Sequence, residues 1–214
     1  MFEYEKLVLG ELATNCYLLW DSQSQEAAVI DAADSAETIS EEIEKRQLKL
    51  KYVISTHGHF DHNLAALGLK LIYQVPFCAS QKDFFLLARQ QESANHFLGA
   101  KIQVPNFKKI DIDLDKTESL SLGEQKIKII KTPGHTPGGV SILADKFLFD
   151  GDLIFTEGVR GDTRHQYSSD REMFRSICKV LELPDEVEIL PGHGETTTVA
   201  KAREMFNCQY GEWN

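Results

Sequence analysis

The sequence predicts a single α/β domain, residues 1–214, in which two β-sheets pack face to face and helices cover the outside. Three observations lead to this prediction. Short apolar, β-prone runs recur along the chain, and several precede segments with helical spacing of apolar residues. No Pro-, Gly- or Ser-rich linker divides the chain. With 214 residues, 42% of them apolar, the chain can bury one large core.

The expected strands are short apolar runs, often ending just before a turn. They are Glu3–Leu9, Cys16–Trp20, Ala27–Asp31, Tyr52–Ser55, Phe77–Ala79, Ile127–Lys131, Val140–Leu143, Phe147–Asp150 and Val187–Leu190. The first two are expected to pair as a hairpin around Gly10. The segment Ala100–Lys116 has no pattern that assigns it to a helix or a strand.

Helices are expected where apolar residues recur at helical spacing. They begin near Asp34, at about His62 (to Leu69), at Lys82 (to Phe97), behind Ser169, and at Thr198 (to Asn207). Asp34 with Glu37, and Ser169 with Glu172, have the spacing of a capping box. Two inward faces are predicted: Phe84, Phe85, Leu87 and Ala88 in one helix, and Phe174, Ile177, Cys178 and Leu181 in another, with Cys178 as a small core residue.

The composition excludes some classes of function. The net charge of −10 argues against binding to a phosphate backbone, which needs a basic footprint, so no nucleic-acid partner is expected. No apolar run approaches the ~20 residues that cross a bilayer. The N-terminal MFEYEKLVLG carries acidic residues where a secretion signal carries basic ones. A cytoplasmic protein that does not associate with membranes is therefore expected.

Histidine is concentrated in turns that follow predicted strands. THGHFDH, residues 56–62, directly follows one strand, and TPGHTPGG (132–139), DGD (150–152) and PGHG (191–194) follow three others. Strand ends that converge on one edge of a sheet would bring these turns together, where loops on a rigid scaffold commonly carry catalytic residues. Glycine and proline beside each polar residue indicate tight turns that aim a side chain.

Imidazole and carboxylate groups in such turns suit Zn²⁺, Fe²⁺ or Mn²⁺. The candidate ligands are His57, His59, Asp61, His62, His135, Asp152 and His193. This set is too large for one tetrahedral ion and fits two ions, which a carboxylate can bridge. Thr56 and Thr132 either orient ligating histidines or serve their turns alone. His96 and His165, outside these turns, are expected to be ordinary residues, with a place at the rim of a pocket as the less favoured alternative for His165.

These motifs resemble a known family. THGHFDH is similar to the HxHxDH signature of the metallo-β-lactamase fold, and TPGHTPGG, GD at 151–152 and PGHG continue the resemblance in order and spacing from about Asn15 to His193. TPGHTPGG with a late PGHG looks most like the glyoxalase II (hydroxyacylglutathione hydrolase) branch. The resemblance implies an αββα sandwich of two mixed β-sheets flanked by helices, with the site at one edge of the sheets.

The resemblance also implies how the metal ions are held. Two ligand sets joined by a bridging Asp152 are implied: His57, His59 and His135 in the first, and Asp61, His62 and His193 in the second. Two divalent ions are expected, Zn²⁺ first, with Fe²⁺ and Mn²⁺ as alternatives. Such ions lower the pKa of bound water toward ~7, so that a metal-bound hydroxide attacks an acyl carbon while Asp61 both ligates and positions it.

The sequence departs from the glyoxalase II pattern at two points. Full-length glyoxalase II has a C-terminal helical extension that grips glutathione, whereas only 21 residues follow His193 here, so no such extension is expected. Many relatives carry a Gly-Arg-Thr-Asp run after the bridging aspartate, whereas residues 158–164 read GVRGDTR. No role is assigned to Arg160 or Arg164.

The preferred function is hydrolysis of a small-molecule thioester, with lactones and other esters as alternatives. A second hypothesis is an iron-dependent persulfide dioxygenase, whose single metal ion would be held by His57, His135 and Asp152. A third is a metal-stabilised binding protein without turnover, against which the intact ligand set argues. Substrate specificity is expected to reside in residues 82–114, 158–168 and the C-terminal helix.

Overall fold

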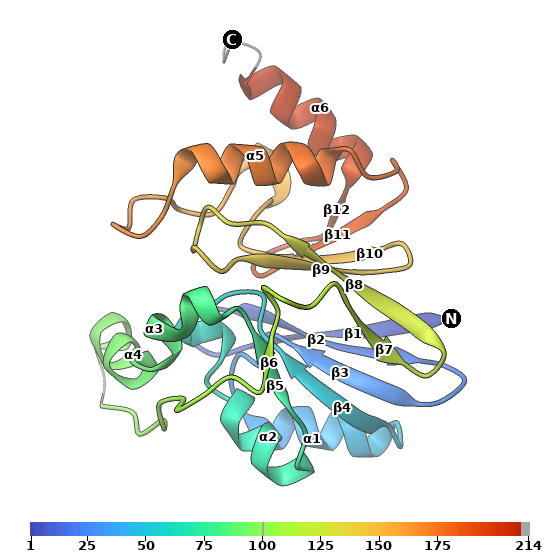
Figure 1. Cartoon of the computed structure of the whole chain (residues 1–214), viewed down its shortest axis with the longest axis vertical. Coiled ribbons are helices and arrows are strands. Elements are labelled where there is room, and N and C mark those ends of the chain that lie inside the picture. The colour runs from blue at the N-terminus through green and yellow to red at the C-terminus, as the bar shows by residue number, and fades with distance from the viewer. Residues whose placement is uncertain (100, 211–214) are drawn as a thin grey trace.

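The computed structural model describes residues 1–99 and 101–210, which form two stacked β-sheets with helices on both outer faces (Figure 1). The first sheet contains β1 (Phe2–Leu9), β2 (Thr14–Asp21), β3 (Glu26–Ile30), β4 (Lys49–Ile54), β5 (Phe77–Ala79) and β6 (Ile112–Asp113). The second contains β7 (Ser119–Leu122), β8 (Gln125–Lys131), β9 (Val140–Ala144), β10 (Phe147–Gly151), β11 (Glu188–Pro191) and β12 (Thr197–Thr198).

Both sheets are mixed. The first has the order β1-β2-β3-β4-β5-β6, antiparallel from β1 to β3 and parallel from β3 to β6. The second has the order β12-β11-β10-β9-β8-β7, in which only β10 and β11 run parallel. The predicted hairpin around Gly10 is confirmed, since β1 and β2 pair from Phe2 opposite Asp21 to Leu9 opposite Thr14.

Helices cover the outer face of each sheet and so complete the predicted αββα sandwich (Figure 1). The helices are α1 (Ala36–Lys45), α2 (Ala66–Tyr73), α3 (Phe84–Leu87), α4 (Gln90–Leu98), α5 (Asp170–Leu181) and α6 (Val199–Tyr210). Three 3₁₀ turns, η1 (Phe60–His62), η2 (Gln81–Asp83) and η3 (Thr156–Gly158), lie in the connections. No helix in the described part of the chain is both long enough and apolar enough to span a membrane.

The core has three layers. Tyr17, Phe149 and their neighbours fill the space between the sheets, where their rings meet edge to face with centroids 5.1 Å apart. A second cluster, with Ile39 and Leu69, lies between the first sheet and α1 and α2, and a third, with Ile177, lies between the second sheet and α5 and α6. Because both sheets are buried on both faces, their ends are held rigidly.

Two predicted helices differ from the structure. The cap of α1 is Ser35, whose hydroxyl accepts a hydrogen bond from the Thr38 amide, because the carboxylate of Asp34 is already used by the Ser35 amide. The predicted helix from Lys82 to Phe97 is divided into η2, α3 and α4, since the chain leaves helical geometry at Arg89. Phe85, predicted to be buried, is exposed.

The buried face of α5 also differs from the prediction. Ser169 caps this helix as expected. The buried residues are Met173, Ser176, Ile177 and Val180, whereas Phe174 and Cys178 are exposed. The inward stripe consists of Met173, Ile177 and Val180, which pack in the third cluster, and Ser176 beside it donates a hydrogen bond of 2.6 Å to the Pro133 carbonyl. Cys178 is therefore not a core residue.

Candidate active site

The seven candidate ligands meet at one edge of the two sheets. The turn after β4 supplies His57, His59, Asp61 and His62; the turns after β8, β10 and β11 supply His135, Asp152 and His193. Their potential ligand atoms form groups within 4.8 Å of one another. The backbone of the β1–β2 hairpin closes this edge, since Thr14 bridges to His193 and the Asn15 amide donates to the Gly192 carbonyl.

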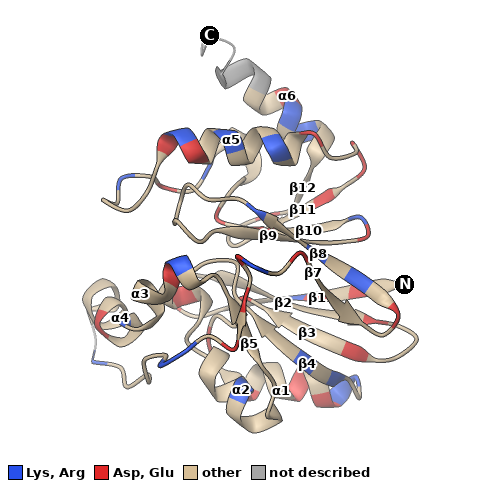
Figure 2. Cartoon of the chain, viewed as in Figure 1, with Lys and Arg blue, Asp and Glu red and all other residues tan. Residues whose placement is uncertain are grey.

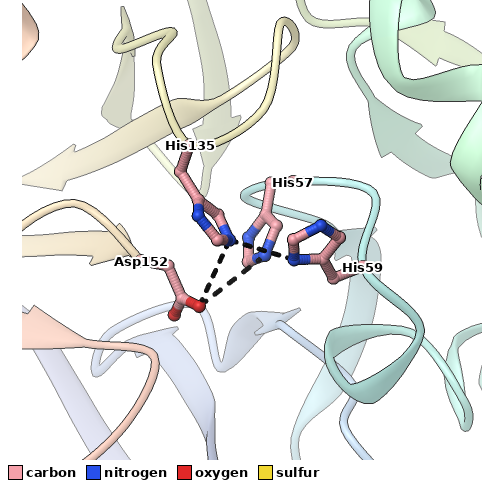
Figure 3. A group of neighbouring side chains, drawn as sticks. All are labelled: His57, His59, His135 and Asp152. Atoms are coloured by element: carbon pink, nitrogen blue, oxygen red, sulfur yellow. Dashed lines mark hydrogen bonds and ion pairs between the residues drawn. The ribbon is translucent and has the colours of Figure 1, made fainter. Parts of the chain in front are cut away.

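The first group consists of His57, His59, His135 and Asp152 (Figure 3). Asp152 Oδ2 lies 3.5 Å from His135 Nε2 and 4.0 Å from His57 Nε2. His59 turns its Nδ1 toward the same point and lies 2.9 Å from His135 Nε2. Three ring nitrogens and one carboxylate oxygen thus face a common centre.

The second group consists of Asp61, His62 and His193. Asp61 Oδ2 lies 3.5 Å from His62 Nε2 and 3.3 Å from His193 Nε2. Asp152 faces this group with its other oxygen, Oδ1, which lies 3.5 Å from His62 Nε2 and 3.8 Å from His193 Nε2. The carboxylate of Asp152 therefore stands between the two groups, with one oxygen toward each.

The donor atoms suit metal ions. Within the described residues, His57 Nε2, His62 Nε2 and Asp152 Oδ1 are buried and have no hydrogen-bond partner, an arrangement that usually costs about 1–3 kcal/mol per group. Their common orientation toward the two centres accounts for this cost if they are ligands. Imidazole and carboxylate are also the donors that Zn²⁺, Fe²⁺ and Mn²⁺ accept.

In these histidines the ring nitrogen that faces away from the ligand centres has its own hydrogen-bond partner, which fixes the orientation of the ring. His62 Nδ1 donates to Asp31 Oδ2 at 2.9 Å, His135 Nδ1 donates to the Asp162 carbonyl at 2.7 Å, and His193 Nδ1 donates to the Leu12 carbonyl at 3.2 Å. In these three rings the proton sits on Nδ1, so in the neutral ring Nε2 carries the lone pair. The Nε2 of His59 lies 2.8 Å from the hydroxyl of Tyr167.

Of the two threonines singled out from the sequence, only Thr56 contacts a site histidine. Its hydroxyl donates to Asp31 Oδ2 at 2.7 Å and lies 3.1 Å from His57 Nδ1. Thr132 instead pairs with the Ser141 hydroxyl at 3.0 Å and contributes to its own turn. Asp31, at the end of β3, thus supports one residue from each group, directly for His62 and through Thr56 for His57.

Asp83 connects two of the site loops. This buried carboxylate accepts hydrogen bonds from the Gly58 amide (2.9 Å), the Thr136 hydroxyl (2.6 Å) and the Gly138 amide (2.6 Å). A Cβ atom at Gly58 would lie 2.8 Å from the Asp83 Cβ, so glycine is required for this close approach. No pattern in the sequence marks this role, because Asp83 follows no motif and its partners lie up to 55 residues away.

The two ligand groups differ in the charge state that their surroundings favour for the histidines. Burial and the neighbouring histidines lower the pKa of His57 and of His59 well below the usual value, which keeps both rings neutral. Burial alone would also lower the pKa of His62, but the carboxylates of Asp61, Asp152 and Asp31 outweigh it and raise the pKa to about 10. The carboxylates therefore favour positive charge in the second group.

A cavity of about 180 Å³, here called the site cavity, opens beside the two groups. His59, Asp61, His135 and Asp152 line it together with apolar side chains and with His165 and Tyr167. His165 was predicted to be an ordinary residue, and its ring in fact stacks on Tyr167 in the wall of this cavity. The less favoured alternative, a place at the rim of a pocket, is therefore the one that the structure shows for His165.

The two arginines left unassigned both bind nearby acidic residues. Arg160 binds Thr163 and Asp170, and Arg164 forms an exposed ion pair with Asp162. His96, predicted to be ordinary, packs against Phe97 near the end of α4 and is absent from the metal-type clusters of the described residues.

Two mixed sheets flanked by helices, with a histidine- and aspartate-rich centre at the sheet edge, define a class of metal-dependent enzymes. The chain belongs to the metallo-β-lactamase superfamily, whose family model matches residues 9–193. It is 35% identical over 201 residues to the hydroxyacylglutathione hydrolase GloC of Haemophilus influenzae, covering 88% of this chain and 89% of the relative. It is 30% identical over 179 residues to a probable polyketide biosynthesis zinc-dependent hydrolase, PksB, of Bacillus subtilis, covering 83% and 72%.

Solved structures agree with the fold. A B3 metallo-β-lactamase, BLEG-1, superimposes with a TM-score of 0.86 at 28% identity, covering 94% of this chain and 97% of that one. TTHA1623, solved in a di-iron-bound form, superimposes with a TM-score of 0.82 at 26% identity, covering 94% and 98%. Family membership and the site together support the function of a metal-dependent hydrolase.

Proposed function

We propose that residues 1–214 form a dinuclear metallohydrolase that cleaves thioesters or related esters. The observation that carries this proposal is the carboxylate of Asp152, which directs Oδ2 to His57 and His135 and Oδ1 to His62 and His193. By resemblance, the one-metal alternative carries the same seven residues, so the identity of the ligands alone does not decide between one ion and two. The second group is as complete and as well supported from behind as the first, which argues for two ions.

The ligands would be His57, His59 and His135 for one ion, Asp61, His62 and His193 for the other, and Asp152 for both. Bound ions of this kind lower the pKa of water and polarise a carbonyl oxygen. The residues of the chain then have three tasks. They hold the ions at fixed positions, supply carboxylate oxygens beside the reacting carbon, and exclude bulk water.

Asp61 has a place in this scheme beyond ligation. Its Oδ2 accepts a hydrogen bond of 3.1 Å from the Thr14 hydroxyl, which fixes the carboxylate at the floor of the site cavity. A substrate carbonyl in that cavity would lie against Asp61, His59 and His135. The fixed carboxylate can accept a proton from, or orient, the group that attacks the carbonyl.

The thioester class is supported by the hydroxyacylglutathione hydrolase relative, and Zn²⁺ by the zinc-dependent hydrolase relative. TTHA1623 was solved in a di-iron-bound form, so iron should be tested alongside zinc. Lactones and other esters belong to the same reaction class, because each presents an acyl carbon to the same site.

Metal content and turnover test the proposal together. Protein purified without added metal is analysed for zinc, iron and manganese, then titrated with each ion while thiol release from S-acyl thioesters is measured. Two ions per chain at full activity, loss of activity on chelation, and a lower melting temperature after chelation are expected. Full activity with one ion, or oxygen consumption with a persulfide and no thioester cleavage, would overturn the dinuclear hydrolase.

A further inference from the structure

Apolar and acidic side chains line the cavities beside the two ligand groups. Beside the site cavity lies a second cavity of about 260 Å³, here called the side cavity. The two share Leu12, Phe60 and Asp61, so a substrate whose acyl carbon lies at Asp61 can extend into both. The acyl group would then occupy the site cavity and the leaving group the side cavity.

The rim of these cavities is apolar. Leu12 lines both and is 45% exposed, and Phe97 lines the site cavity and is 62% exposed. The Phe97 ring stacks on Phe60, with centroids 5.8 Å apart. Phe85, 46% exposed, packs against Tyr167, which lines the site cavity. Exposed apolar side chains gathered around a cavity mark a binding surface for apolar groups.

The charged residues in these walls also favour an uncharged substrate, because they are acidic. Glu11 and Asp34 line the side cavity with Asp61, and no lysine or arginine is found among the described residues that line either cavity. Elsewhere, charged residues of both signs are spread over outer helices such as α1 and α5 (Figure 2). The net charge of −10 adds to the repulsion of anions. Apart from the metal-ligand groups, a substrate with free carboxylates would find no lysine or arginine among the described residues of these walls.

We infer that the substrate is an uncharged thioester or ester with a bulky apolar acyl group, and that Phe97 and Glu11 set this specificity. The inference rests on the proposed hydrolase function. Phe97 selects for apolar acyl chains by contact, because its exposed ring is available to cover them. Glu11 selects against anionic leaving groups by charge, because it is exposed on the hairpin beside the side cavity.

Four thioesters test this specificity: acetyl and hexanoyl esters of N-acetylcysteamine, which are uncharged, and the same two esters of glutathione, which carry two carboxylates. For the metal-loaded protein, kcat/KM is expected to be on the order of tenfold higher for the uncharged leaving group. A preference of about tenfold or more is expected for hexanoyl over acetyl, because four further methylenes are partly buried.

Two variants, each with a matched control, separate the contribution of Phe97 from that of Glu11. Phe97→Ala should reduce the ratio of kcat/KM for hexanoyl over acetyl esters by about fivefold, whereas Phe174→Ala, on α5, should leave that ratio unaltered. Glu11→Lys should raise the ratio of kcat/KM for glutathione esters over uncharged esters by about threefold to thirtyfold. Glu41→Lys makes the same charge change on α1 and should have little effect.

Binding gives a readout that does not depend on turnover. The thioethers S-hexyl-N-acetylcysteamine and S-hexylglutathione are not hydrolysed. Calorimetry should show that the uncharged thioether binds more tightly than S-hexylglutathione. Phe97→Ala should weaken the binding of the hexyl group, and Glu11→Lys should strengthen the binding of S-hexylglutathione. Efficient cleavage and tighter binding of the glutathione compounds would overturn this inference and leave the hydrolase intact. Failure to cleave any of the four thioesters in the metal-loaded protein would instead overturn the thioester hydrolase, and the inference with it.

Discussion

The carboxylate of Asp31 lies 2.9 Å from Nδ1 of His62, and both side chains are buried. The same carboxylate accepts hydrogen bonds of 2.7 Å from the Thr56 amide and the Thr56 hydroxyl. One aspartate at the end of β3 therefore fixes the ring of His62 and, through Thr56, that of His57. These two rings belong to different ligand groups, so Asp31 sets the relative position of both centres.

We expect Asp31→Ala to weaken metal binding by about 10- to 100-fold, because His62 loses the partner that orients its ring. Stability should also fall, since the Thr56 amide loses its acceptor. Asp21→Ala is the matched control: Asp21 is also buried and hydrogen-bonded but lies at the other end of β2 from Thr14. Metal titration should separate the two variants, and equal affinity in both would contradict the role of Asp31.

Asp61→Ala tests whether two ions act together. If they do, the variant should lose roughly one ion per chain and about 100-fold or more in turnover, a loss of ~3 kcal/mol in transition-state stabilisation. The fold should survive, because Asp61 lies in the η1 turn and belongs to none of the three hydrophobic clusters. Side-by-side metal analysis of the wild type and the variant is the measurement. Unchanged metal content with near-normal turnover would rule out the dinuclear enzyme.

Asp83→Ala should destabilise the site without removing a ligand. The change leaves the Gly58 and Gly138 amides without their acceptor, so we expect a loss of about 2–4 kcal/mol in the free energy of unfolding and looser metal binding. Thr136→Val removes only one of the three hydrogen bonds and should cost about 1 kcal/mol. Urea unfolding of the metal-free proteins measures both, and equal losses would contradict the connection of the loops through Asp83.

Acid stability should depend on Asp21, far from the metal groups. Burial alone would raise its pKa, but hydrogen bonds from the Ser24 amide and hydroxyl, the N-terminus and Gln125 outweigh it and hold the pKa below the usual 3.8. Its stabilisation is therefore complete above about pH 4 and is lost as the pH falls toward the folded-state pKa. Asp21→Asn should be less stable than the wild type at pH 7, by about 1–3 kcal/mol.

The difference between the two proteins should shrink as the pH falls from 4 to 2, because the wild-type carboxylate then becomes protonated. Unfolding by urea at several pH values measures it. A difference that is constant or grows toward low pH would show that Asp21 does not act through its charged form. Comparing the two proteins at each pH cancels the titration of the site residues, which they share.

The sequence by itself determined the layered fold and the seven candidate ligands. Both follow from local patterns: apolar runs of strand length define the sheets, and the glycine- and proline-bounded turns after β4, β8, β10 and β11 carry the histidines and aspartates. Their convergence on one edge followed from the resemblance to the metallo-β-lactamase fold and not from the strand pattern, because neighbouring antiparallel strands end at opposite edges of a sheet.

Only the tertiary structure decided what surrounds these ligands. Asp31, Asp83, Tyr167 and His165 act on the site across 25 to 108 residues of sequence, and no local spacing marks them. The orientation of α5 was decided in the same way, since Met173, Ile177 and Val180 pack against the second sheet and leave Cys178 exposed. Local sequence fixes which residues can form a turn or a helix face, whereas packing selects which polar groups are satisfied in the interior.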